Sequence, residues 1–187
     1  FAAEHPQMDA ETAALLRFEQ EQLERLSALV RTLLEMSDLQ SVPRTDCIDL
    51  APMAEEVLVD LTPLAQKNGI TLTQTGENVQ LTGSDVLLYR VLFNLTENAI
   101  KYNRTGGSVE VSVEREGGQA AIRVRDTGPG IAEEYRDSIF QPFFRIDKSQ
   151  NRSLGGVGLG LSLVWEIINL HGGKVEVMES SERGTVI

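Results

Sequence analysis

The segment Asn94-Leu-Thr-Glu-Asn98-Ala-Ile-Lys101-Tyr102 lies in a stretch whose pattern predicts a helix. Apolar residues recur at intervals of three and four between residues 87 and 102, as on the buried face of a helix. Because of their spacing, Asn94, Asn98 and Lys101 should project from one face. Two amide oxygens and an ammonium group can hold a hydrated Mg²⁺ and the phosphates that it bridges. An Asn pair alone is more often a solvated helix face or a cap, so the downstream segments must decide between these interpretations.

The composition excludes some classes of protein and leaves others open. The 187 residues carry a formal net charge of −11 and no basic stretch, which argues against a nucleic-acid-binding protein. ATP stays possible, because it needs only a few local cations and a metal. Cys47 is the only cysteine, so no intrachain disulfide can form, which fits a reducing compartment. No apolar run approaches the length that crosses a bilayer, and the N-terminus is not a signal peptide. The chain starts without Met and stops within a predicted strand, so we expect a longer protein.

Residues 9 to about 38 are predicted to form one long helix, with Asp9 as its N-cap. Leu16, Leu23 and Val30 are seven residues apart, and further apolar residues widen this stripe beyond a coiled-coil seam. So wide a stripe is typical of a helical bundle, whose partner helix comes from sequence outside this chain or from a second copy. The alternative is that the stripe packs on the domain that follows.

A hinge at Ser41-Val-Pro43-Arg-Thr separates this helix from an alternating series of helices and strands. Asp49 is the predicted N-cap of a helix over 50–67, in which Pro63 should cause a kink. Ser84 is the predicted N-cap of the helix that carries Asn94. Period-two alternation predicts strands at 70–75, 79–81, 108–114, 119–125 and 174–178, with a turn at Gly117-Gly118 and a last strand from Gly184.

The strand over 119–125 leads into Asp126-Thr-Gly128-Pro-Gly130-Ile131. A carboxylate at the end of a strand, followed by two glycines, has the shape of a binding site. The glycines let backbone approach a ligand closely, and the Asp can accept a hydrogen bond from an amino group on a base. The alternative is an ordinary turn, since these residue types form turns in any fold.

Two further segments contain the residues expected to contact an anion. The aromatic cluster from Ile139 to Arg145 precedes a polar stretch in which Lys148 and Arg152 are the cations, either for phosphate contact or on a solvated loop. Gly155-Gly156-Val-Gly158-Leu-Gly160-Leu then opens a helix over 161–170, and glycines before a helix N-terminus favour anion binding. The pattern is neither a Rossmann fingerprint nor a Walker A loop. His171 ends this helix and is interpreted as a C-terminal capping residue rather than a ligand.

Together these segments resemble a bacterial two-component sensor histidine kinase. Residues 25–37 resemble the second helix of its dimerisation domain, and the rest resembles its catalytic ATP-binding domain, of the gyrase, Hsp90, histidine kinase and MutL superfamily. The asparagine box, first glycine box, phenylalanine box and second glycine box match at 94–102, 126–130, 140–145 and 155–161. The resemblance implies an α+β fold, a two-layer α/β sandwich of the Bergerat type, preceded by a long bundle-forming helix. It divides the chain into a partial dimerisation and histidine-phosphotransfer helix, 1–42, and an ATP-binding catalytic domain, 43–187.

The resemblance also implies a role for each matching residue. Asn94 and Asn98 would ligate Mg²⁺, Lys101 would contact phosphate, and Tyr102 would lie along the adenine. Asp126 would accept from the adenine amino group, and Thr185 would help to hold Asp126 and its water. The loop from Arg145 to Ser153 would be the ATP lid. The full set implied to bind ATP is Asn94, Asn98, Lys101, Tyr102, Asp126, Gly128, Gly130, Ile131, Phe144, Arg145, Lys148, Arg152, Gly156, Val157, Gly158, Leu159, Gly160, Leu161 and Thr185.

The implied activity is that of a protein-histidine kinase with ATP and Mg²⁺ as cofactors. The γ-phosphate would pass to a His in the first dimerisation helix and then to an Asp of a response-regulator receiver domain. Related ATPases have a Glu at the position of Asn94 as the general base for water. An amide cannot take that proton, so hydrolysis should be poor here. The implied protein is a homodimer through the N-terminal helix, the cytoplasmic portion of a membrane-anchored sensor, with its membrane contact upstream and no nucleic-acid partner.

The resemblance breaks at the phosphoacceptor. The family has a His, usually followed by Glu, in the first dimerisation helix, whereas this chain has only His5 and His171. Neither sits in that motif, so no catalytic residue is assigned, and we expect the chain to bind ATP without phosphorylating itself. Two alternatives stay open. One is an ATP-hydrolysing clamp of the same superfamily, which steady phosphate release would reveal. The other is a degenerate nucleotide-binding dimeric scaffold, which absence of Mg²⁺-dependent binding would reveal.

Overall fold

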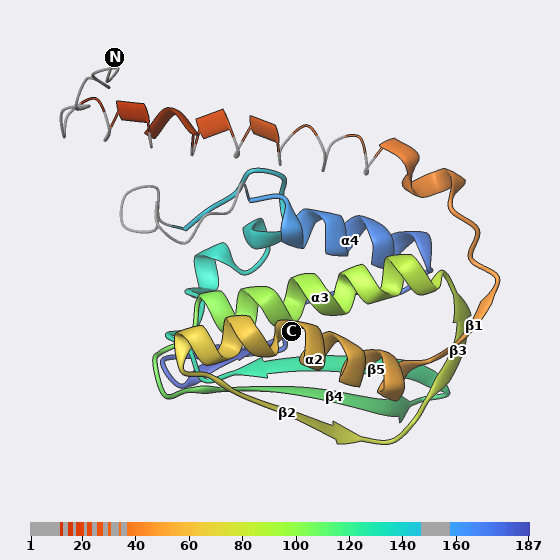
Figure 1. The fold of residues 1–187 in the computed structure, drawn as a ribbon. Helices are drawn as coiled ribbons and strands as arrows, with labels where there is room; N and C mark the ends of the chain where they lie inside the picture. The colour runs from red at the N-terminus through yellow and green to blue at the C-terminus, as the bar shows by residue number, and fades with distance from the viewer. Residues whose placement is uncertain are drawn as a thin grey trace, which may run out of the picture.

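Five strands form the main sheet of the computed structural model, with helices packed on one of its faces (Figure 1). The structure describes residues 37–146 and 158–187, together with 12, 15, 16, 18–20, 22, 23, 26, 27, 30 and 34. The sheet order is β2-β4-β5-β7-β6, in which β2 runs parallel to β4 and the other neighbours are antiparallel. The strands are β2 (Thr71–Gly76), β4 (Ser108–Glu116), β5 (Gln119–Asp126), β6 (Glu179–Ser181) and β7 (Gly184–Val186).

Three helices cover the sheet and one another. α2 (Leu50–Asn68) and α3 (Asp85–Lys101) contact the strands and each other, and α4 (Gly160–Leu170) packs on α3. A small second sheet pairs β1 (Asp46–Asp49) with β3 (Gln80–Gly83) at the end where α2 and α3 begin. Short 3₁₀ turns are η1 (Leu39–Ser41), η2 (Glu133–Tyr135) and η3 (Ser138–Phe140). The predicted α+β class is therefore confirmed.

The hydrophobic core lies between the helices and the sheet. α3 buries Leu88, Val91, Leu92 and Leu95, with the three- and four-residue spacing found in the sequence. Their partners on the sheet are alternate β4 residues, Val109, Val111 and Val113, of which each is at most 1% exposed. These contacts fix the position of α3 against the sheet.

The two predicted N-cap residues occupy their positions but bond differently from the expectation. In the described structure neither Asp49 nor Ser84 caps its helix through its side chain. Asp49 Oδ1 instead accepts from Asn78 Nδ2 at 2.7 Å and Gln80 Nε2 at 2.9 Å. The backbone N–H of Ser84 donates to His171 Nε2 at 3.0 Å. At Asp49 the side chain has tertiary partners in place of the local capping bond, whereas at Ser84 it is the backbone N–H that has a tertiary partner.

The predicted boundaries hold for the longer elements and fail at the sheet edge. α2 continues through Pro63 to Asn68, and Gly117 and Gly118 form the predicted turn with φ of 55° and 86°. The strand predicted at 174–178 is wrong, because β6 begins only at Glu179. β6 is an edge strand whose partner β7 has three residues, so a longer strand would have no ladder to join. The short strand β1 was not predicted.

The described residues between 12 and 38 are helical, as predicted. Their apolar side chains are exposed, with Leu23 at 65% and Leu26 at 57%, so the described part of the stripe does not pack on the following domain. Leu39, just beyond, is 2% exposed and joins the core. Within the part of the chain that the structure describes, no helix combines the length and the apolar character needed to cross a membrane.

Candidate functional site

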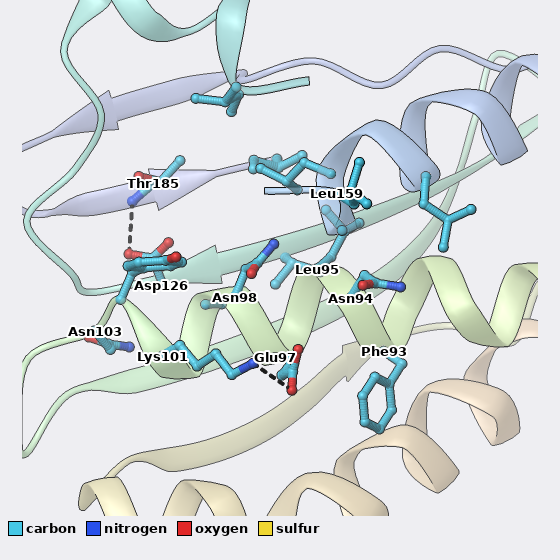
Figure 2. A pocket seen from close by; sticks show the side chains of 18 of the residues that line it. Phe93, Asn94, Leu95, Glu97, Asn98, Lys101, Asn103, Asp126, Leu159 and Thr185 are labelled. Carbon is cyan, nitrogen blue, oxygen red and sulfur yellow. Dashed lines mark hydrogen bonds and ion pairs between the residues drawn. The ribbon is translucent and has the colours of Figure 1, made fainter. Parts of the chain in front are cut away.

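A cavity of about 1280 Å³ runs along α3 and ends at the strand end of β5. Figure 2 shows it from close by. Most of the residues singled out in the sequence line it: Asn94, Asn98, Lys101, Tyr102, Asp126, Gly130, Ile131, Phe144, Arg145, Gly158, Leu159, Gly160, Leu161 and Thr185. Gly128 lies beside the cavity. Lys148, Arg152, Gly156 and Val157 lie outside the described residues.

The two asparagines face the start of α4. Asn94 Nδ2 donates to the carbonyl of Arg90 at 2.8 Å, which directs Asn94 Oδ1 to the other side. A Cβ at Gly160 would lie 2.9 Å from that oxygen and 3.8 Å from Asn98 Nδ2. Figure 2 shows both amides on the side of α3 toward Leu159. The first residue of α4 therefore has to be small for the helix to approach the pair.

Lys101 has a partner that the sequence interpretation did not single out. Its Nζ lies 2.8 Å from Glu97 Oε1, and both side chains are about one quarter exposed, at 23% and 28%. Figure 2 shows the lysine running along α3 to Glu97, whereas the amides of Asn94 and Asn98 point toward Leu159. The prediction that all three project together is thus only partly right: they share the cavity, but Lys101 is turned to Glu97.

Asp126 is held by backbone at the other end of the cavity. Its Oδ1 accepts from the N–H groups of Gly128 at 2.7 Å and Thr185 at 3.3 Å. Burial raises the pKa of Asp126 above its usual 3.8, and these two hydrogen bonds oppose the increase. Among the described residues, none donates to Oδ2, so this oxygen is left for a ligand. One carboxylate oxygen positions the side chain while the other faces outward.

A hydroxyl network behind Asp126 fixes the glycine-rich turn. Ser180 Oγ accepts from the N–H of Ile131 at 2.7 Å and lies 3.1 Å from Thr185 Oγ1. Gly130 has φ of 80°, and a Cβ there would overlap the Ser181 carbonyl oxygen. Thr185 contacts Asp126 through its backbone rather than its hydroxyl. Sequence reasoning missed Ser180, because nothing in its neighbourhood indicates that the β6–β7 hairpin reaches this turn.

The segments on either side of residues 147–157 are joined to each other. The N–H of Phe143 donates to the carbonyl of Gly158 at 2.9 Å. Phe143 has φ of 65°, uncommon for a residue with a side chain, and Gly158 has φ of 80°. A Cβ at Gly158 would lie 2.8 Å from the Phe144 carbonyl oxygen. The phenylalanine segment and the second glycine segment therefore meet, although they are separate motifs in the sequence.

His171 fastens the far end of α4 to the start of α3. Its Nδ1 lies 2.8 Å from the carbonyl of Ile167, and its Nε2 accepts from Ser84 N–H. Both bonds together require the neutral tautomer that carries its proton on Nδ1. The interpretation of His171 as a capping residue is consistent with this geometry, and both its ring nitrogens are engaged within the fold.

The donor set of the Asn94 and Asn98 pair fits Mg²⁺ bound together with phosphate. Amide oxygens are hard ligands of the kind this ion prefers, and Mg²⁺ commonly takes one or two protein ligands, with phosphates and waters for the rest. Within the described part of the chain, no cluster of three or more His, Cys, Asp or Glu side chains could hold a metal alone. A metal at this pair would accordingly depend on phosphate ligands.

Comparison with known proteins gives a consistent result. Residues 83–187 match the family described as histidine kinase-, DNA gyrase B- and HSP90-like ATPase. The sensor-like histidine kinase SenX3 of Mycolicibacterium smegmatis is 32% identical over 86% of this chain and 43% of its own length. The sensor protein CutS of Streptomyces coelicolor is 36% identical over 88% of this chain and 40% of its own. The chain thus spans about two fifths of these relatives.

Solved structures give the same result for the fold. The catalytic domain of histidine kinase ThkA has a TM-score of 0.68 and 29% identity, covering 77% of this chain and 92% of that one. ThkA in complex with the response regulator protein TrrA has a TM-score of 0.73 and 28% identity, covering 95% of this chain and 50% of that one.

Proposed function

This chain belongs to the histidine kinase-, DNA gyrase B- and HSP90-like ATPase family, as the catalytic domain of a two-component sensor histidine kinase, and we propose that it binds Mg-ATP along α3. The adenine would lie at the Asp126 end and the phosphates at the Asn94 end. The γ-phosphate would then pass to a histidine outside these residues and from there to an Asp of a response-regulator receiver domain. The family supports ATP as the ligand. The position of ATP along α3 and the transfer of its γ-phosphate to a histidine are what we propose.

The geometry of Asp126 is the observation that carries this proposal. An adenine presents a 6-amino donor, whereas guanine presents a 6-oxo acceptor. A half-buried carboxylate whose Oδ1 is already occupied by two backbone N–H groups offers Oδ2 to a donor. The cavity that starts there continues along α3 to Asn94 and Asn98, so base and phosphates would have separate ends.

The phosphate end would position rather than cleave. Mg²⁺ held by Asn94 and Asn98 would supply charge neutralisation for the phosphates. A neutral imidazole nitrogen would form a bond to the γ-phosphorus as the bond to the β,γ-bridging oxygen breaks. ADP would leave, and the proton on the other ring nitrogen would be released. Because Asn94 is an amide, it cannot take a proton from water, which favours this transfer over hydrolysis.

Titration of the chain with ATP and GTP in the presence of Mg²⁺ tests the base end, with Asp126→Asn as the variant. An Asn keeps an acceptor for Gly128 and Thr185 but turns an NH₂ toward the ligand, where it would oppose the adenine amino group. We expect ATP affinity to fall about 10- to 100-fold, as for the loss of a charge-assisted hydrogen bond. GTP affinity should fall less or rise. Equal loss for both nucleotides, or no loss, contradicts the assignment of Asp126.

Label transfer from γ-labelled ATP tests the reaction. A longer native chain that includes the preceding helix should acquire acid-labile phosphate on a histidine upstream, whereas the 187-residue chain should bind ATP and stay unlabelled. Label on His5 would overturn the second expectation. Sustained phosphate release without labelled protein would indicate an ATP-hydrolysing clamp instead.

The assembly of the whole protein is also part of the proposal. The exposed apolar stripe of the N-terminal helix supports a homodimer through a helical bundle, to which residues 1–42 would contribute the helix predicted over 9–38. The similarity to ThkA, which has been solved in complex with the response regulator protein TrrA, supports a response regulator as partner. The similarity to sensor proteins supports a cytoplasmic catalytic part that is attached to a membrane sensor through other segments.

A further inference from the structure

Glu97 and Lys101 form an ion pair inside the candidate cavity. Lys101 Nζ lies 2.8 Å from Glu97 Oε1, and both residues line the space along α3. Asn98 lies between them in sequence but faces the start of α4 (Figure 2). A phosphate that binds Lys101 therefore competes with a carboxylate for the N–H groups of the ammonium.

We propose that Glu97 is a specificity-determining residue that makes nucleotide binding depend on the divalent metal. Without ligand its carboxylate pairs with Lys101. When phosphates bind Lys101, the freed carboxylate faces them and repels them unless a metal accompanies them. This inference rests on the proposed binding of ATP along α3.

Glu97 is the acidic residue closest along α3 to the proposed phosphate end. Asn94 and Asn98 are neutral, so they add no negative charge that would attract a metal by itself. Glu97 lies between them in sequence and is the carboxylate nearest to them on α3. The other described acidic residues that line the cavity lie elsewhere: Glu56 and Asp60 on α2, Asp85 at the start of α3, and Asp126 at the base end. Glu97 is therefore the carboxylate that a polyphosphate near Lys101 would meet.

The exchange of partners at Lys101 should weaken the binding of metal-free ATP more than the binding of Mg-ATP. Free ATP brings several negative charges, and bringing them next to Glu97 costs Coulomb energy on the order of 1 kcal/mol at 4 Å in water, or about fivefold in affinity. A bound Mg²⁺ cancels two of those charges, so the penalty largely disappears. The carboxylate thus lowers the affinity for metal-free nucleotide more than that for Mg-ATP.

A purely structural explanation of the pair makes a different prediction. Glu and Lys four residues apart on an exposed helix face stabilise the helix slightly. If that were the whole role of Glu97, its removal would change thermal stability a little and leave the metal dependence of binding unchanged. The ratio of the two affinities, with and without metal, therefore separates the explanations.

The experiment measures ATP dissociation constants of the full 187-residue chain with Mg²⁺ and with EDTA. The variants are Glu97→Gln, Lys101→Gln and the double variant. The control is Glu114→Gln. Glu114 lies on β4, outside the cavity lining, and its Oε2 is 2.7 Å from a guanidinium nitrogen of Arg123. We expect Glu97→Gln to tighten metal-free binding about fivefold and Mg-ATP binding about twofold or less. The control should change neither.

The double variant tests whether Glu97 acts through Lys101. With Lys101→Gln in place only the repulsion remains, so Glu97→Gln should tighten metal-free binding by less than it does alone. An equal effect in both backgrounds would overturn the exchange. If the wild type binds Mg-ATP and Glu97→Gln has the same metal dependence, this inference alone is wrong. If the wild type binds no ATP, the proposed function is wrong and this inference falls with it.

Discussion

The two ends of the cavity differ in how far they are built before a ligand arrives. At the base end, Asp126 is held by two backbone N–H groups, and the Ser180 hydroxyl ties the turn at Ile131 to the β6–β7 hairpin. At the phosphate end, Lys101 is paired with Glu97 instead of facing the asparagines. The proposed base end is preorganised, whereas binding of a phosphate at the other end would require an exchange of partners at Lys101.

The difference indicates how the site divides its tasks. Backbone hydrogen bonds cannot rearrange without local unfolding, so the proposed base end would discriminate by fixed geometry. A partly exposed ion pair contributes little to stability and opens readily, so the phosphate end can respond to charge and metal. Substitutions at each end can test this contrast.

Gly130→Ala should break the base end. The backbone there has φ of 80°, and the added Cβ would overlap the Ser181 carbonyl oxygen. We expect a loss of unfolding free energy on the order of 3 kcal/mol, from the strained φ and the forced separation of the turn from β6. Chemical denaturation measures it.

Gly118→Ala is the matched control for that variant. Its φ is 86°, and no atom lies within 4 Å of the added Cβ, so only the backbone strain applies, about 1 kcal/mol. Equal losses in both variants would show that the contact of Gly130 with the hairpin does not hold the base end together.

His171→Leu should loosen the phosphate end from a distance. The N–H of Ser84, a residue that is 1% exposed, would lose its acceptor, and the link between α4 and α3 would go with it. We expect a loss of about 2 kcal/mol in unfolding free energy, as for an unsatisfied buried donor. In the protein that stays folded, affinity for Mg-ATP should fall more than affinity for adenosine. An equal loss of affinity for Mg-ATP and for adenosine would mean that α4 does not act on the phosphate end in particular.

Lowering the pH should change both the folding stability that Asp126 contributes and the affinity of the proposed base end for a ligand. Since burial raises the pKa of Asp126, its contribution to folding stability is fully present below the unfolded value of 3.8 and is lost as the pH rises through the folded value. Ligand binding has the opposite sign, because acceptance from an amino group requires the ionised form.

Adenosine, which has no phosphates, is the probe for this effect. As the pH is lowered, adenosine affinity should begin to decline at a higher pH than it would if Asp126 had an ordinary pKa. Circular dichroism at the same pH should show an intact fold. An affinity that stays constant until the range of an ordinary Asp would contradict the raised pKa.

Local patterns were sufficient to predict the helices and the glycine-rich turns. The apolar spacing in α3 identified its buried face, since a helix presents every third or fourth residue to the same neighbour. Gly117 and Gly118 indicated a hairpin because few other residues adopt positive φ at both positions. Residue type and local context singled out Asn94, Asn98 and Asp126 but left a solvated helix face and an ordinary turn as alternatives, and only the four motifs taken in order along the chain favoured a binding site.

The contacts that join distant segments could not be predicted in the same way. His171 meets Ser84 across 87 positions, and Ser180 meets Ile131 across 49. No periodicity encodes such a pairing, because it depends on how α4 and the β6–β7 hairpin pack after each has formed. The strand predicted at 174–178 fails for a related reason: alternation indicates a preference for strand, but only a neighbouring strand provides the ladder.

Short-range spacing and residue chemistry were enough to predict the α+β class and the helix that carries the asparagines, and the order of the four motifs added the groups proposed to meet a ligand. The tertiary structure decided how those groups are engaged. It added the N–H of Thr185 to the local bond from Gly128 at Asp126 Oδ1 and fastened α4 to the start of α3 through His171. These two contacts join residues 59 and 87 positions apart, which meet only once the layers have packed, whereas Lys101 and Glu97 are neighbours along one helix.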